Sequence, residues 1–175
     1  MRTHTSAEMA DWLAVPVFGD PVPHFPTVVR PSAYGIIRNG NGHLAAVRTP
    51  SGLYLSGGGQ VGAEAPEVAL EREVREECAL AVRVGMWRRA AVEHVSSRME
   101  RTHFEKRSTF CDATVIASAG DAAEEGYTLM WVSSDEAVAA LRPESHRWAI
   151  TEWLRDGGRP VQAGHLDRSH DVRRS

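Results

Sequence analysis

The chain has 175 residues and a formal net charge of −3 at pH 7, which suits one domain and argues against a nucleic-acid-binding module with a basic face. Hydrophobic residues make up 42% and no stretch approaches the ~20 apolar residues that span a bilayer, so we expect a globular protein away from the membrane. The two cysteines lie in no metal-ligand spacing, which argues against a zinc site. The N-terminus lacks the apolar core of a secretory signal, which predicts a cytoplasmic protein.

Residues 1–32 are predicted to form an extended arm, because five prolines interrupt any long helix there. These are Pro16, Pro21, Pro23, Pro26 and Pro31. Residues 33–155 are predicted to form the domain. The polar segment 156–175 is predicted to be a tail.

The domain is predicted to open with a β-hairpin. Its strands cover Ala33–Arg38 and His43–Thr49, and the turn is Asn39–Gly42, whose Asn and Gly residues tolerate the positive φ of tight turns. Further strands are expected over Leu53–Leu55, Leu80–Val84, Arg89–His94, Phe110–Ala117 and Thr128–Val132.

The clearest helix is predicted over Pro66–Cys78. Its apolar residues Leu70, Val74 and Cys78 recur every four positions. Two shorter helices are expected over Asp135–Leu141, capped by Ser133 or Ser134, and over Glu144–Leu154. Strands that alternate with a few helices indicate a layered α/β domain.

One face of the Pro66–Cys78 helix is acidic. At 3.6 residues per turn, Glu73, Glu76 and Glu77 point to one side, where their charges repel one another. A solvated acidic face is the ordinary interpretation of such a pattern. The alternative is a site for a hard cation such as Mg²⁺, which prefers carboxylate oxygens.

The residues around this helix favour the metal site. They read Gly58, five residues, Glu64, seven residues, Arg72-Glu73-Val74, one residue, Glu76-Glu77, one residue, Ala79-Leu80. This spacing resembles the Nudix box and matches eight of its nine specified positions. The departure within the box is Ala79, where the family pattern has glycine. Ser56 also stands where relatives usually have proline before the glycines.

The resemblance implies a Nudix-type α/β/α sandwich with a mixed β-sheet. It also implies an enzyme that uses Mg²⁺, or Mn²⁺ in its place, to hydrolyse a diphosphate linkage. Its partner would be a nucleotide-like small molecule, with no nucleic acid or membrane, and a homodimer is common in the family.

The resemblance also implies roles for individual residues. Glu73, Glu76, Glu77 and the carbonyl of Gly57 would be metal ligands, and Glu73 would help to activate water. Arg72 and Glu64 would orient the carboxylates through ion pairs. The glycine run, which includes Gly58, would let the backbone approach metal and phosphate closely. Glu105, with Glu124 and Glu125 as alternatives, is the candidate for a further ligand or base from a loop.

The substrate is less defined than the chemistry. His94-Val95-Ser96-Ser97, shortly after the box, carries neither the proline typical of ADP-ribose hydrolases nor the tyrosine typical of dinucleoside polyphosphate hydrolases. The default expectation is a nucleoside triphosphate pyrophosphohydrolase of the MutT kind, some of which act on oxidised nucleotides. Three alternatives stay open: hydrolysis of a nucleotide sugar, ADP-ribose or dinucleoside polyphosphate; a non-catalytic nucleotide-binding Nudix module; and an acidic helix on an unrelated α/β domain.

Overall fold

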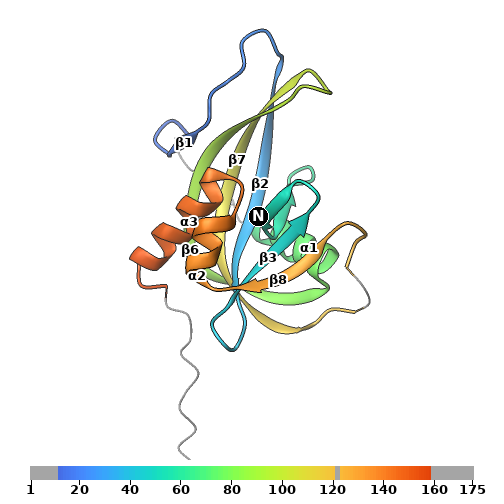
Figure 1. Cartoon of the computed structure of the whole chain (residues 1–175), viewed down its shortest axis with the longest axis vertical. Helices are drawn as coiled ribbons and strands as arrows, with labels where there is room; N and C mark the ends of the chain where they lie inside the picture. The colour runs from blue at the N-terminus through green and yellow to red at the C-terminus, as the bar shows by residue number, and fades with distance from the viewer. Residues whose placement is uncertain (1–11, 121–122, 159–175) are drawn as a thin grey trace, which may run out of the picture.

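The structure, a computed structural model, describes residues 12–120 and 123–158 (Figure 1). It contains an eight-stranded mixed sheet with one helix against one face and two helices against the other. The predicted α/β/α sandwich is therefore confirmed. The predictions for residues 1–11 and 159–175, at the outer ends of the arm and tail, lie outside the described residues, and the domain boundaries stay a prediction.

The strands are β1 (Val17–Phe18), β2 (Thr27–Arg38), β3 (Leu44–Thr49), β4 (Gly52–Leu55), β5 (Gly57–Gly59), β6 (Leu80–Ser97), β7 (Thr102–Ser118) and β8 (Thr128–Val132). The helices are α1 (Pro66–Cys78), α2 (Ser134–Ala140) and α3 (Glu144–Arg155). The sheet order is β1-β6-β7-β2-β3-β4, with β5 paired to β2 and β8 paired to β3. The β1–β6 and β2–β7 pairs are parallel and the others antiparallel.

The sheet separates two apolar cores, because successive side chains of a strand point to opposite faces. On β2, Ala33 and Ile37 face α1, whereas Tyr34 and Ile36 face α3. Both faces are buried, so the strand reads as a continuous apolar run rather than an alternating one. In the described part of the chain, no helix is long and apolar enough to cross a membrane.

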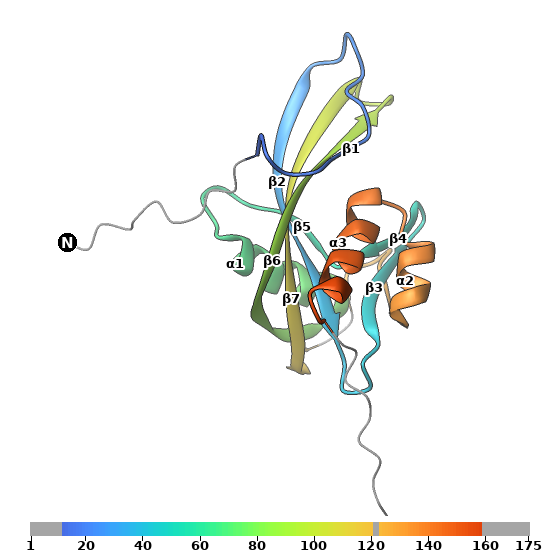
Figure 2. The ribbon, with the colours of Figure 1, turned by 90° about the vertical axis from the view of Figure 1, so that its left-hand side faces the viewer.

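Strands β2, β6 and β7 continue past the helices as a projecting ribbon (Figure 2). Two predictions are corrected here. The strand expected to begin at Ala33 begins at Thr27, since the last six residues of the predicted arm pair in register with β7, from Thr27–His103 to Ser32–Ser108. The strand expected to begin at Phe110 begins at Thr102 for the same reason.

The two strands predicted over Leu80–Val84 and Arg89–His94 form one strand, β6. Its pairing with β7 is interrupted by a bulge between Val84 and Arg88, which explains the break in the apolar pattern. Asp112 on β7 accepts a hydrogen bond from the backbone N–H of Trp87 at 3.1 Å and so fixes the bulge.

Helix α1 ends at the residue where the box departs from the family pattern. Ala79 has φ 52° and ψ 39°, the left-handed conformation, and its N–H donates to the Arg75 carbonyl at 3.0 Å. Alanine disfavours this conformation whereas glycine adopts it freely. Alanine thus occupies a left-handed turn at the position where the family pattern has glycine.

Ala79→Gly is therefore expected to stabilise the protein by about 1 kcal/mol, because relief of the left-handed strain outweighs the greater freedom of glycine in the unfolded chain. Urea unfolding of the variant beside the parent protein measures this difference. A decrease in stability would show that Ala79 is unstrained or that its methyl group contributes packing that outweighs the strain.

Candidate active site

The three predicted carboxylates lie on the part of α1 that adjoins β5 and Ser56, the residue between β4 and β5. Leu70 and Val74 are fully buried under the sheet and fix the rotation of the helix. This rotation places the Glu77 carboxylate against the backbone that leads into β5 and the Glu73 carboxylate against Gly58. The acidic face is thus packed against the glycine run rather than turned to solvent as a whole.

Glu77 is the most buried of the three, with 7% of its surface exposed. Its Oε2 accepts hydrogen bonds from the Ser56 hydroxyl at 2.8 Å and from the Gly57 N–H at 3.0 Å. Burial raises the pKa of Glu77 to about 7, and the nearby charges of Glu73 and Glu124 add to the shift. No lysine or arginine forms an ion pair with Glu77 within the described residues.

Arg72 holds the other carboxylates of the box. Its guanidinium contacts Glu64 at 3.0 Å, Glu73 at 2.7 Å and Glu76 at 3.3 Å. It also donates to the Gly59 carbonyl at 3.0 Å. Hydrogen bonding by Arg72 lowers the pKa of Glu64, which therefore stays ionised as its partner. Arg72 and Glu64 thus link the start of the loop to the acidic face of α1.

Gly58 leaves room for the Glu73 carboxylate. A Cβ atom at this position would lie 2.6 Å from Cδ and Oε2 of Glu73, closer than atoms can approach. Gly57 is restricted in another way: with φ 141°, its Cβ would lie 2.1 Å from the backbone oxygen of Ala33. Gly57 is thus required by the fold, and Gly58 is required by the position of the Glu73 carboxylate.

These residues fit a hard divalent cation by their chemistry. Carboxylate oxygens are the preferred ligands of Mg²⁺, and a buried, unpaired carboxylate such as that of Glu77 is stabilised by a nearby positive charge. In the geometry described, however, no three His, Cys, Asp or Glu side chains already converge on one point among residues 12–120 and 123–158. Glu73 and Glu76 bond to Arg72 instead, so metal binding would require these two exposed or half-buried side chains to turn.

A pocket adjoins the buried carboxylate. It has a volume of about 280 Å³, close to the lower end of the range of small-molecule sites. Its walls include Gly57 and Glu77 from the box, Tyr34 from β2, Lys106 from β7 and Tyr127 before β8. Burial raises the pKa of both tyrosines, and the negative charge of Glu77 raises it further. The charge of Glu77 therefore acts on side chains across the pocket.

No protein-family model matches the chain, and no curated protein matches it in sequence. Solved structures do resemble it. A NUDIX hydrolase from Nitrosomonas europaea superposes with a TM-score of 0.57 at 20% identity, over 77% of this chain and 94% of that one. A MutT protein from Methanosarcina mazei Go1 gives 0.55 at 19% identity, over 77% and 97%. The E. coli dihydroneopterin triphosphate pyrophosphohydrolase gives 0.52 at 15% identity, over 74% and 99%.

The chain has the Nudix fold. This finding confirms the fold predicted from the resemblance of the Gly58–Leu80 segment. The fold brings close to one another the residues that the resemblance to the Nudix box had grouped, which are Gly57, Gly58, Glu64, Arg72, Glu73, Glu76 and Glu77.

Within this Nudix fold, the placement of Glu105 differs from the prediction. Glu105 was expected in a loop near the metal ligands, but it lies inside β7, where its carboxylate bonds Nε of Arg107 at 2.7 Å. The physical reason is the length of β7, which incorporates the segment that the sequence suggested was a loop. Glu124, the alternative, does lie in a loop beside the box, since its N–H donates to the Glu76 carbonyl at 2.9 Å.

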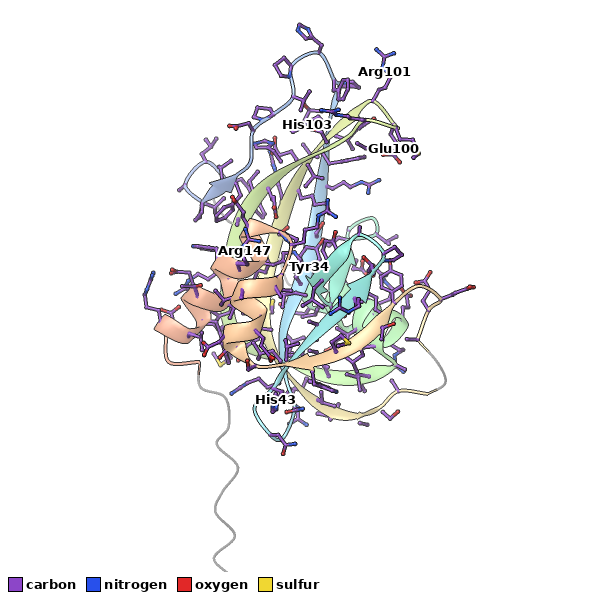
Figure 3. All side chains as sticks on the ribbon, viewed as in Figure 1. Tyr34, His43, Glu100, Arg101, His103 and Arg147 are labelled. Carbon is purple, nitrogen blue, oxygen red and sulfur yellow. The ribbon has the colours of Figure 1, made fainter. Side chains whose placement is uncertain are left out.

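The sequence did not single out the other residues that shape this region. Ser56 was noted as a departure from the family pattern, and the structure gives it a partner in Glu77. Tyr34, Lys106 and His146 were not predicted to line one pocket, because they come from three separate elements and meet only in the folded chain. Figure 3 shows Tyr34 in the middle of the sheet, whereas His103 lies in the projecting ribbon, where it contacts His94 at 2.9 Å.

Proposed function

We propose that this protein is a Mg²⁺-dependent hydrolase of a diphosphate linkage in a nucleotide-like substrate. The observation that carries the proposal is the packing of Glu73 and Glu77 against Gly58 and Gly57 in a Nudix fold, where Gly57 and Glu77 also line a pocket. An acidic helix on an unrelated domain would have no reason to keep a buried carboxylate without a cationic partner.

We assign the residues the roles that the resemblance to the Nudix box implies. Glu73, Glu76 and Glu77 would hold the cation with the Gly57 carbonyl, and Arg72 and Glu64 would restrain the approach of the first two carboxylates. When bound, the cation neutralises phosphate charge and lowers the pKa of a water molecule so that hydroxide is available near neutral pH. Ser56 and the Gly57 N–H fix Oε2 of Glu77 and so leave its other oxygen to face the ligand.

For the substrate, we propose a nucleoside triphosphate that is cleaved to a monophosphate and pyrophosphate, with an oxidised nucleotide as one form. Support comes from the structural neighbours, one of which is named a triphosphate pyrophosphohydrolase and another a MutT protein. Their low identity ties them to this chain through the fold alone. Hydrolysis of a nucleotide sugar, ADP-ribose or dinucleoside polyphosphate is the alternative within the same chemistry, and a non-catalytic nucleotide-binding module is the alternative to catalysis.

A substrate panel tests the proposal. Phosphate and pyrophosphate release would be followed from nucleoside triphosphates, oxidised nucleotides, nucleotide sugars, ADP-ribose and dinucleoside polyphosphates, with Mg²⁺ or Mn²⁺. Turnover of one class is expected, and a Glu76→Gln/Glu77→Gln variant is expected to lose it by two orders of magnitude or more, about 3 kcal/mol of transition-state stabilisation. Nucleotide binding without turnover in any class would instead support the binding module.

The control for this assay is Glu71→Gln. Glu71 is an exposed carboxylate on the same helix, away from the glycine run, and its replacement removes one negative charge as the test substitutions do. Normal turnover in this variant and in the double variant alike would show that the α1 carboxylates have no catalytic part.

A further inference from the structure

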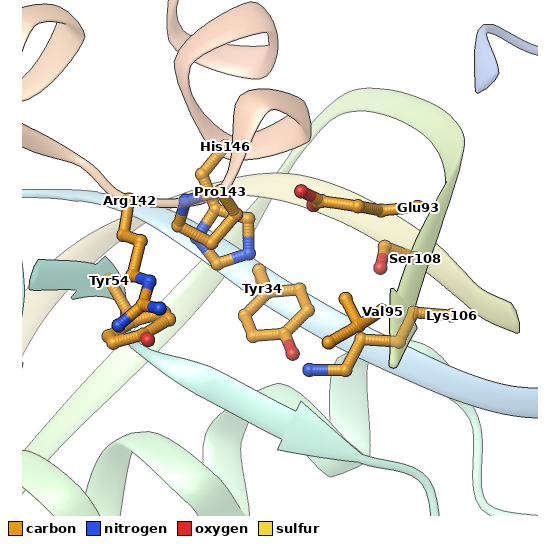
Figure 4. Close-up of a pocket in the computed structure, with 9 residues that line it drawn as sticks. All are labelled: Tyr34, Tyr54, Glu93, Val95, Lys106, Ser108, Arg142, Pro143 and His146. Atoms are coloured by element: carbon orange, nitrogen blue, oxygen red, sulfur yellow. The ribbon is translucent and has the colours of Figure 1, made fainter. Parts of the chain in front are cut away.

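A second pocket continues from the first, away from the acidic face of α1. The two share Tyr34, Tyr54 and Lys106, so together they form one groove that starts at Glu77. The second pocket is lined by Tyr34, Tyr54, Glu93, Val95, Lys106, Ser108, Arg142, Pro143 and His146 (Figure 4). If the diphosphate of the substrate lies at the Glu77 end, the rest of the substrate lies here.

His146, in the first turn of α3, has a fixed pattern of hydrogen bonding. It is 3% exposed, and its Nδ1 accepts the backbone N–H of Leu55 at 3.1 Å. An imidazole nitrogen that accepts a hydrogen bond carries no proton, so in the neutral ring the proton must be on Nε2. Burial lowers the pKa of His146 to about 3, which keeps the ring neutral throughout the physiological range.

The Nε2–H of His146 can therefore only donate a hydrogen bond. It has no hydrogen-bond partner among the described residues, yet it is not one of their fully buried, unsatisfied atoms. Since His146 lines the pocket, we place this N–H at its wall, next to the Tyr34 ring, whose centroid lies 4.3 Å from that of the imidazole (Figure 4). A donor held this rigidly discriminates between ligands because it cannot become an acceptor.

The other charged groups of the pocket reinforce this bias toward donors. Lys106 and Arg142 donate and never accept. Glu93 is the one carboxylate among the described residues that line the pocket, and it already accepts hydrogen bonds from the Ser145 hydroxyl and from the Glu144 N–H, at the start of α3. A ligand in this pocket is thus matched if it presents acceptors.

We propose that His146 is a specificity-determining residue, whose Nε2–H donates to a keto oxygen on the base of the nucleotide. The pocket then selects guanine, uracil or thymine nucleotides over those of adenine and cytosine. Adenine and cytosine carry an amino group in place of the keto oxygen, and this amino group is a donor that cannot accept the Nε2–H of His146. The proposal rests on the proposed function, because the groove places a base here only if the diphosphate lies at Glu77. Apolar and aromatic walls from Tyr54, Val95 and Pro143 suit the faces of a planar base.

Binding of uncleavable nucleotides tests this proposal without relying on turnover. The probes are analogues of GTP, UTP, ATP and CTP with methylene groups in place of both bridging phosphoanhydride oxygens, titrated calorimetrically in Mg²⁺. The parent protein is expected to bind the keto pair roughly tenfold more tightly than the amino pair, the effect of one matched hydrogen bond.

His146→Asn is the main variant. Its Oδ1 can still accept the Leu55 N–H, but no donor reaches the position of Nε2, so the keto preference is expected to fall to about twofold or less while the melting temperature stays near that of the parent. If this variant melts early, His146→Gln provides a second test, since its amide reaches the Nε2 position and should retain part of the preference. His43→Asn, at an exposed histidine in the β2–β3 turn, is the control and should change nothing.

The outcomes are distinguishable. Equal affinity for the four analogues, a preference for the amino pair, or an unchanged preference in His146→Asn would overturn the proposed role of His146 and leave the proposed hydrolase intact. Failure of all four analogues to bind in Mg²⁺ would contradict the nucleotide substrate as well, and the role of His146 with it.

Discussion

Glu77→Gln is expected to make the metal-free protein more stable while it removes the proposed activity. The glutamine oxygen can accept the same two hydrogen bonds, from Ser56 and from the Gly57 N–H, but it carries no charge to be buried. If Glu77 served only to stabilise the fold, its replacement by glutamine would lower the stability of the protein. This inverse relation between stability and function is typical of residues that await a ligand.

The pH dependence of this effect has a definite sign. The pKa of Glu77 is raised from 4.5 to about 7 by burial, so folding favours its protonated form. The ionised form is penalised as pH rises above 4.5, and the penalty reaches its full size above about 7. The stabilisation by Glu77→Gln is therefore expected to be close to zero near pH 4 and to grow to at most about 3 kcal/mol near pH 8.

Urea unfolding in the presence of a chelator, at several pH values, measures this stabilisation. Glu71→Gln serves as the control, because an exposed carboxylate of α1 should give a small difference at every pH. Loss of stability in Glu77→Gln at high pH would mean that the buried charge has a compensating partner that the described residues do not provide.

Gly58→Ala is expected to damage the site and spare the fold. Its new Cβ would lie 2.6 Å from the Glu73 carboxylate, which is the end of a flexible side chain and can move away at small cost. We expect less than about 1 kcal/mol of lost stability, but a loss of turnover of tenfold or more, since an ångström-scale displacement of a ligand group is costly to catalysis.

Gly57→Ala is the matched comparison for Gly58→Ala. Its Cβ would meet the backbone oxygen of Ala33 at 2.1 Å, from a backbone conformation that alanine rarely adopts. We expect a loss of roughly 3 kcal/mol or more in folding stability. Thermal melting and turnover measured on both variants separate the two roles. Equal loss of stability in both would contradict the assignment of Gly58 to the position of Glu73.

The parts of the site that the sequence predicted are local. Helix α1 and its acidic face follow from the spacing of Leu70 and Val74 and from the box, all within one short stretch of chain. The left-handed turn at Ala79 was not predicted, because alanine gives no signal for a conformation that it disfavours.

The parts that the sequence did not predict depend on strand register. Glu105 and Lys106 are neighbours, and in an extended strand they must point to opposite faces of the sheet. Which of them reaches the pocket is decided by the parallel pairing of β7 with β2, which the sequence does not reveal, and it is Lys106. His146 was missed for a related reason: its partner, the Leu55 N–H, is 91 residues away along the chain.

The central claim, that the buried carboxylate of α1 belongs to a metal site, is tested most directly by melting with and without metal. Melting temperatures of the parent protein and of Glu77→Gln would be compared near pH 8, in chelator and in about 10 mM Mg²⁺, where binding to the folded state alone raises stability. We predict that their order reverses: Glu77→Gln melts higher in chelator, and the parent protein melts higher in Mg²⁺. An equal rise with Mg²⁺ in both proteins, or no rise in the parent protein, would contradict the metal site at Glu77.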